Sequence, residues 1–112
     1  MIIKKEIFTR LNEFKAICEN HNVKFMFAYG SSTTDSFDQK SSDIDLLVQI
    51  DEPDPLARGE KLISLWDSLE ALFQRKIDLL TETSIKNPIL KKNIEDTKVL
   101  IYDGTAQKIL NL

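Results

Sequence analysis

Three aspartates lie in or at the start of apolar runs, where a carboxylate is energetically costly. Asp43 and Asp45 begin the run that ends at Ile50, and Asp78 lies inside the run Lys76 to Thr81. Since side chains alternate between the two faces of a strand, Asp43 and Asp45 point to one face. Carboxylates that converge raise one another's pKa, and a divalent cation removes this cost. The pattern therefore predicts a Mg²⁺ site, of one or two metals, formed by Asp43, Asp45 and Asp78.

A Gly-Ser turn precedes these acids. Gly30 and Ser31 directly follow the short apolar run Val23 to Tyr29, and the first acid comes about 13 residues later. Backbone N–H groups and hydroxyls at such a turn can hold phosphate oxygens. The residues that we expect to bind a nucleotide are Gly30, Ser31, Ser32 and Ser42.

Together the turn and the acids are typical of phosphoryl or nucleotidyl transfer, in which metals neutralise a polyphosphate and positioning supplies most of the rate. Asp43 and Asp45 would hold the metal that carries a nucleoside triphosphate. Asp78 would complete a second metal site or deprotonate the attacking hydroxyl. A lone Asp-x-Asp is more often a solvated strand edge or a turn cap, so the prediction depends on the combination of all three features.

Helices and strands alternate along the chain. Apolar residues spaced for one helical face predict a helix over Ile3 to Glu19, with Ile7, Leu11, Phe14 and Cys18 inward. The expected strands are Val23 to Tyr29, Asp43 to Ile50 and Lys76 to Thr81. Two further helices begin where a capping residue precedes a proline, at Asp54-Pro55 and at Asn87-Pro88. The segment Val99 to Tyr102 either continues the last helix, with Gly104 as its stop, or forms a short strand.

This order predicts an α/β fold over a single domain of residues 1–112. We expect a small mixed sheet of about three to four strands with helices packed on one face and the acids on the other face or its rim. One sheet and three helices leave no second domain to recognise a large acceptor, so the acceptor site would come from a partner or a second copy of the chain.

Composition excludes several classes of protein. The net charge of −3 argues against a protein that grips a nucleic-acid backbone. One cysteine and one histidine exclude an intramolecular disulfide and a Cys/His metal cluster. The chain shows no hydrophobic signal core and no apolar run of the roughly 18 residues that a membrane span requires, so a cytoplasmic location is expected.

The set Gly30-Ser31, Ser42-Asp43-Ile44-Asp45 and Ile77-Asp78-Leu79 resembles the minimal nucleotidyltransferases of the polymerase-beta superfamily. The resemblance covers nearly the whole chain. It implies the nucleotidyltransferase fold and Mg²⁺-dependent transfer of a nucleoside monophosphate, AMP from ATP, to a hydroxyl. It also implies a HEPN-domain ribonuclease toxin as partner, with this chain as the antitoxin that modifies it, because small family members are commonly encoded beside such proteins.

The loop after Ser31 departs from the family pattern. Many members continue with a small residue, an arginine and a glycine, whereas here the run is Ser32-Thr33-Thr34-Asp35. In place of that arginine, the candidate cations for binding a triphosphate are Lys40 and the pair Arg75-Lys76. This departure keeps open a second hypothesis, an inactive transferase fold that neutralises its partner by binding alone. A third hypothesis is transfer to a small molecule, but the chain lacks the extra domain that would enclose such an acceptor.

Overall fold

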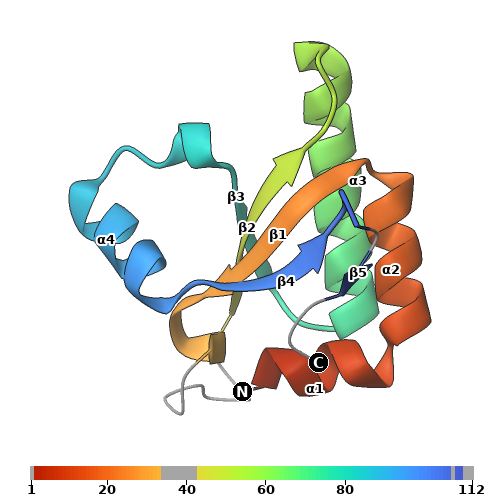
Figure 1. Ribbon diagram of the computed structural model, residues 1–112, viewed down its shortest axis with the longest axis horizontal. Helices are drawn as coiled ribbons and strands as arrows, with labels where there is room; N and C mark the ends of the chain where they lie inside the picture. Colours follow the sequence, from red (N-terminus) through yellow and green to blue (C-terminus); the bar gives the residue numbers. More distant parts are fainter. Residues whose placement is uncertain (1, 34–42, 107, 110–112) are drawn as a thin grey trace.

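A computed structural model describes residues 2–33, 43–106 and 108–109 (Figure 1). Its elements follow in the order α1 (Ile2–Thr9), α2 (Leu11–Asn20), β1 (Val23–Tyr29), the 3₁₀ turn η1 (Gly30–Thr33), β2 (Ile44–Ile50), α3 (Pro55–Phe73), β3 (Ile77–Leu80), the 3₁₀ turn η2 (Glu82–Ser84), α4 (Pro88–Thr97), β4 (Val99–Asp103) and β5 (Lys108–Ile109). The predicted α/β fold is confirmed.

Over the described part of the chain the strands form one mixed sheet in the order β3-β2-β1-β4-β5. The β1 strand pairs antiparallel with both β2 and β4, whereas β2 pairs parallel with β3. The fifth strand has two residues and extends the edge beside β4. The sheet is therefore the predicted small mixed sheet, extended by this short edge strand.

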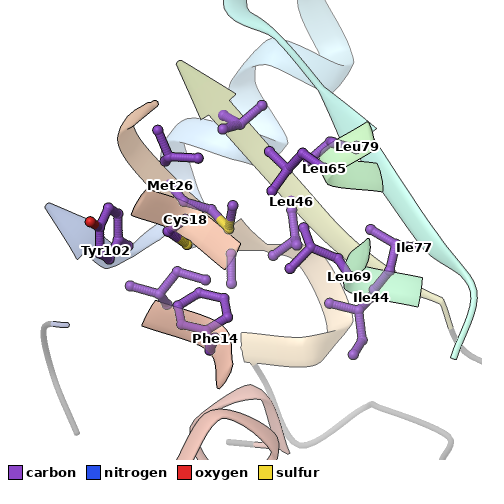
Figure 2. Packing of buried hydrophobic residues seen from close by; sticks show 14 of the residues in the cluster. Phe14, Cys18, Met26, Ile44, Leu46, Leu65, Leu69, Ile77, Leu79 and Tyr102 are labelled. Carbon is purple, nitrogen blue, oxygen red and sulfur yellow. The ribbon is translucent and has the colours of Figure 1, made fainter. Parts of the chain in front are cut away.

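The main core lies between the sheet and the layer of α1, α2 and α3 (Figure 2). Alternate residues of β2 and β3 face this layer, so Ile44, Leu46 and Ile77 are buried against Leu69 of α3. A fully buried branched side chain of this kind contributes roughly 1.5–3 kcal/mol. The same alternation sends Asp45 and Asp78 to the opposite face, as the sequence predicted.

The α3 helix also completes the outer edge of β3. Its N-terminus is capped as predicted, with Asp54 Oδ2 accepting from the Ala57 N–H (3.1 Å) and Pro55 as the first helical residue. Further along α3, Trp66 Nε1–H donates to the Ile77 carbonyl (2.7 Å) and Glu70 accepts from the Ile77 N–H (3.0 Å). These bonds satisfy backbone groups that an edge strand would otherwise expose.

The first predicted helix is wrong as a single element, because the chain breaks into α1 and α2 at Arg10, whose backbone leaves the helical region (φ −131°, ψ 40°). Ile7 and Phe14 are fully buried, but Leu11 remains 39% exposed instead of facing the core. Helical periodicity assumed a straight axis, and the bend at Arg10 turns Leu11 outward.

The expectation that all helices pack on one face is wrong for α4. Its Ile94 packs with Tyr29 and Leu47 in a second, smaller cluster on the face that carries Asp45 and Asp78. The segment after α4 forms the strand β4, so the alternative stated for Val99 to Tyr102 is the correct one. None of the helices among the described residues combines the length and hydropathy of a membrane-spanning segment.

Candidate functional site

Asp45 and Asp78 are direct neighbours across the parallel pair of β2 and β3. On its other side Asp45 lies opposite Tyr29, the last residue of β1. Asp43 precedes β2 by one residue, on the same alternation as Asp45. The three predicted acids therefore lie near the same end of the neighbouring strands β2 and β3, and each is partly open to solvent.

Charge repulsion and burial act together on Asp45. Burial first, and then repulsion by the neighbouring carboxylates of Asp78 and Asp43, together raise the pKa of its carboxyl group to about 6. The same physics raises the pKa of the Tyr29 hydroxyl, through burial first and then through Asp45 and Asp78. The site thus has an excess of negative charge, which a bound cation would relieve.

The Gly30 turn fits against Asp45. Gly30 has φ +71°, a backbone conformation that L side chains rarely adopt, and a Cβ atom added there would lie 2.9 Å from Asp45 Oδ2. Thr33 Oγ1 donates to the Gly30 carbonyl (2.7 Å) and holds the turn closed. The positive φ therefore favours glycine at this position, and the contact with Asp45 shows that the predicted link between the turn and the acids exists in the structure.

Thr97, at the end of α4, contacts the same turn and was not anticipated from the sequence. The Gly30 N–H donates to Thr97 Oγ1 (2.9 Å), and that hydroxyl donates to the Asn93 carbonyl (2.8 Å). The N–H of Gly30 is thus already paired with the protein, so a phosphate at η1 would be held by N–H groups further along the turn. A contact between positions 30 and 97 leaves no local signal in a sequence.

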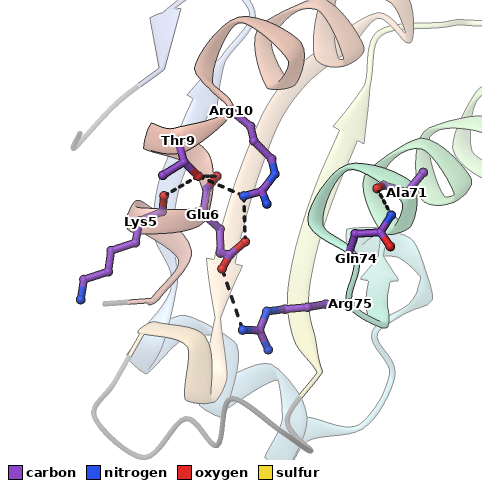
Figure 3. A network of polar contacts seen from close by, with 7 residues as sticks. All are labelled: Lys5, Glu6, Thr9, Arg10, Ala71, Gln74 and Arg75. Carbon is purple, nitrogen blue, oxygen red and sulfur yellow. Dashed lines mark hydrogen bonds and ion pairs between the residues drawn. The ribbon is translucent and has the colours of Figure 1, made fainter.

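Other predicted site residues have different outcomes. Ser42 and Lys40 lie outside the described residues, and for Ser31 and Ser32 the structure describes only the backbone. Arg75 lies 3.9 Å from Glu6, which also accepts a hydrogen bond from Arg10 (3.2 Å) (Figure 3). This network joins α1 to the start of β3, so Arg75 has a structural role whether or not it also reaches a nucleotide.

The carboxylates suit a hard divalent cation, although the described residues contain no group of three or more His, Cys, Asp or Glu side chains placed to enclose a metal. Mg²⁺ usually takes one or two protein carboxylates and fills its other positions with water and substrate phosphate. A pair of adjacent carboxylates with mutual repulsion, Asp45 and Asp78, matches that requirement. The residues present therefore fit a metal that is shared with a nucleotide.

Replacing Thr97 with Val should destabilise the protein by about 1 kcal/mol, because the Gly30 N–H loses its acceptor while the shape of the side chain is kept. Chemical denaturation measures this loss. Thr105→Val is the matched control, since Thr105 is exposed and the loss of its hydroxyl bond to Asp103 should cost no more than about 0.5 kcal/mol. Equal effects of the two variants would contradict a specific role for the contact between Thr97 and Gly30.

Comparison with known proteins identifies the family. Residues 12–107 match the family model described as "Polymerase beta, Nucleotidyltransferase". Two relatives from Methanocaldococcus jannaschii are named "Putative protein adenylyltransferase MJ0126" and "Putative protein adenylyltransferase MJ0128". The first is 38% identical over 87 residues, covering 78% of this chain and 85% of the relative. The second is 40% identical over 89 residues, covering 79% and 84%.

Solved structures show the same fold at lower identity. One, named as a toxin-antitoxin crystal structure with AMP-PNP, has a TM-score of 0.59 at 19% identity, covering 82% of this chain and 72% of that one. Another, named "Structure of putative minimal nucleotidyltransferase", has a TM-score of 0.57 at 21% identity, covering 88% and 95%. The family match, the relatives and the fold agree, and the chain belongs to the polymerase beta nucleotidyltransferase family.

Proposed function

We propose that this nucleotidyltransferase moves AMP from ATP to a hydroxyl group of a partner protein. The observation that carries the proposal is the pairing of Asp45 with Asp78 beside the Gly30 turn, which puts two carboxylates next to the turn that we propose as the phosphate-binding segment. The choice of AMP and of a protein acceptor is supported by the relatives, which are named as protein adenylyltransferases.

In this proposal the roles follow from position. Gly30 shapes the η1 turn, and the N–H groups that follow it, at Ser31 and Ser32, bind the triphosphate together with Ser42. Asp43, Asp45 and Asp78 hold Mg²⁺. Bound Mg²⁺ would neutralise the phosphate charge that these acids would otherwise repel. Because the pKa of Asp45 is about 6, its carboxyl group is mostly ionised at neutral pH and able to bind a cation.

The transfer step needs a base for the acceptor. Asp78 is partly exposed on the face of the sheet that also carries Asp45, so an acceptor hydroxyl can reach it from that face. Asp78 takes the proton of the acceptor hydroxyl, whose oxygen forms a bond to the α-phosphorus. The bond from that phosphorus to the bridging oxygen of the β-phosphate breaks, and pyrophosphate leaves. The products are an AMP ester of the acceptor and pyrophosphate.

The acceptor that we propose is a HEPN-domain toxin, for which this chain would act as antitoxin. The family resemblance supports this choice, and several structures of similar fold are named as toxin-antitoxin crystal structures. Residues 1–112 would then form one minimal nucleotidyltransferase domain, and the partner would supply the surface that positions the hydroxyl.

Labelled ATP tests the reaction directly. When the chain is incubated with Mg²⁺ and a HEPN-domain protein that co-purifies with it, α-labelled ATP should label the HEPN protein and γ-labelled ATP should not. Asp78→Asn should remove the label while the two proteins still bind each other. Labelling from γ-labelled ATP would indicate phosphoryl transfer instead. An unlabelled but fully neutralised partner would support the hypothesis of a binding module.

A further inference from the structure

A groove of about 400 Å³ lies at the end of β2 that is opposite the acids, between the first half of α3 and η2. It is lined by residues 48–50 at the end of β2, by Arg58, Gly59 and Leu62 of α3, and by residues 81–83 after β3. Residues 82 and 83 also border a second pocket, of about 290 Å³, between η2 and α4 on the carboxylate face. The groove is therefore separate from the acids and from the proposed phosphate-binding turn.

The β2 strand is longer than the strand beside it. β3 pairs with β2 from Ile77 to Leu80, and the last partner on β2 is Leu47, whereas β2 continues to Ile50. The α3 side chains that cover the outer edge of β3 form their bonds at Ile77. The end of β2 therefore has an open outer edge in the groove, and such an edge is a template for an added strand.

The backbone of Ile50 points to this open edge. The Asp51 N–H donates to the Asn22 carbonyl, on the side of β1 (2.7 Å), and the Ile44 N–H donates to the Lys76 carbonyl, on the side of β3 (3.1 Å). Because the backbone groups of successive residues point to opposite edges of a strand, Ile50 has the orientation of Ile44. Its N–H and carbonyl groups therefore face the groove.

Gly59 keeps the groove open on the side of α3. Glycine is less favourable than alanine inside a helix, and an added Cβ at Gly59 would meet no atom within 4 Å, so no neighbour among the described residues requires a glycine here. Leu56 and Ile63 lie on the same helix face, three residues before and four residues after Gly59, and are 73% and 65% exposed. A bare stretch of helix between two exposed apolar side chains lets the backbone of another segment approach closely.

The charges at the rim favour a basic residue in the occupant. On the α3 side, the Arg58 guanidinium donates to the Glu52 carbonyl (2.9 Å). On the opposite side Glu82 is exposed, and its carboxylate can pair with a lysine or an arginine. A second copy of this chain is a poorer match, because its net charge of −3 adds repulsion between the two molecules.

We infer that the groove binds an extended segment of the acceptor protein, which adds to the edge of β2 at Ile50, packs an apolar side chain against Gly59 and Leu62, and carries a basic residue beside Glu82. The inference rests on the proposed function for the identity of the partner. A nucleotide lacks the repeating backbone donors and acceptors that pair with a strand, so the open edge selects a polypeptide. Ile50 lies five residues from Asp45, about 17 Å along β2, so a protein held in the groove can also present a hydroxyl to the acids.

Binding of the acceptor tests the groove. Isothermal titration calorimetry measures Kd for the separately purified HEPN-domain protein of the labelling experiment, with wild type and with Gly59→Gln. The glutamine side chain fills the groove without adding charge, and the open space at this position and the better helix propensity of glutamine keep the variant folded. Its Kd should rise at least about tenfold, as expected when a buried contact of an interface is blocked.

Ala71→Gln is the matched control, because it adds the same side chain at an exposed position of α3, 12 residues and about 18 Å further along the helix. It should bind the acceptor like wild type. A Gly59→Gln protein with unchanged Kd would overturn the docking site. A dimer of the chain alone that Gly59→Gln dissociates, measured by light scattering, would assign the groove to a second copy and overturn the inference as well.

Amide hydrogen exchange followed by NMR tests the mode of binding. The Ile50 N–H should exchange at least about tenfold more slowly in the complex, because it gains a carbonyl partner. The Asp51 N–H is the internal reference, since it is already bonded to the Asn22 carbonyl. A complex without added protection at Ile50 would overturn strand addition.

The labelling reaction separates this inference from the proposed function. Gly59→Gln should raise the KM for the acceptor and leave kcat unchanged, because the groove does not contact the reacting groups. A lower kcat with unchanged KM would overturn the docking role. If wild type forms a complex that protects Ile50 but transfers no label, the proposed function fails and the docking site stands.

Discussion

Asp45→Asn is expected to reduce transfer at least about 10²-fold and, at the same time, to stabilise the folded protein at pH 7.5. The loss of transfer follows because an amide binds Mg²⁺ poorly. The gain in stability follows because the variant removes a carboxylate that burial, Asp78 and Asp43 all disfavour. A variant that is less active and more stable is characteristic of a site whose charges are arranged for binding rather than for folding.

The gain should depend on pH in a defined direction. The pKa of Asp45 is about 6 in the folded protein, compared with 3.8 for an aspartate in the unfolded chain. Between these values the folded state binds more protons, so stability falls as the pH rises through this window. The difference between variant and wild type should therefore be largest above about pH 6 and disappear near pH 4. We expect about 1 kcal/mol at pH 7.5, after the screening that water gives a half-buried group.

Urea denaturation at several pH values measures this difference, and the labelling reaction measures transfer. Asp67→Asn is the control, because Asp67 is exposed on α3, away from the acids. It should change neither stability nor transfer by a measurable amount. An Asp45→Asn protein that keeps its activity would remove the proposed metal role of Asp45. One that is less stable than wild type at pH 7.5 would contradict the described electrostatics.

Gly104→Ala should lower the free energy of unfolding by about 3 kcal/mol or more, because it forces a methyl group against the backbone of β1. A Cβ atom at Gly104 would lie 2.0 Å from the Val23 carbonyl oxygen, and this close approach is held by the bond from the Gly104 N–H to the Lys24 carbonyl (2.7 Å). A flexible side chain could move aside, but the β1 backbone cannot move without breaking its pairing with β2 and β4.

Gly59→Ala provides the contrasting substitution in the same protein. Gly59 lies inside α3, and an added Cβ would meet no atom within 4 Å. Alanine there should therefore stabilise the protein by about 0.5–1 kcal/mol, through helix propensity alone. Denaturation of both variants checks the pair. A Gly104→Ala protein as stable as wild type would show that β1 and the end of β4 are further apart than described.

Elements with strong local signals were predictable. The β1 strand has the predicted bounds Val23 to Tyr29, and β2 begins one residue later than expected, at Ile44. The α3 helix begins at Pro55 after the Asp54 cap, as the pair predicted. Each of these depends on neighbouring residues only, on apolar character or on the capping geometry of a few positions, and so each can be inferred without knowledge of the fold.

Elements that depend on distant contacts were not predictable in the same way. The break at Arg10 exposes Leu11, although the spacing of Ile7, Leu11 and Phe14 fits a straight helix. The local sequence is compatible with Gly104 as a helix stop, whereas in the structure Gly104 follows β4 and is required because β1 lies against it. In both cases the local pattern is compatible with two structures, and packing against other segments selects one.

The candidate site divides in the same way. Residue types and spacing were enough to select Asp43, Asp45, Asp78 and the Gly30-Ser31 turn, because a carboxylate inside an apolar strand and a glycine at a strand end are costly without a function. Only the tertiary structure decided that Asp45 and Asp78 are paired and that Thr97 holds the turn. It also decided that η2 and α4 enclose a pocket beside the acids. Alternation along a strand determines which face a side chain takes, but strand order and helix docking determine what it meets there.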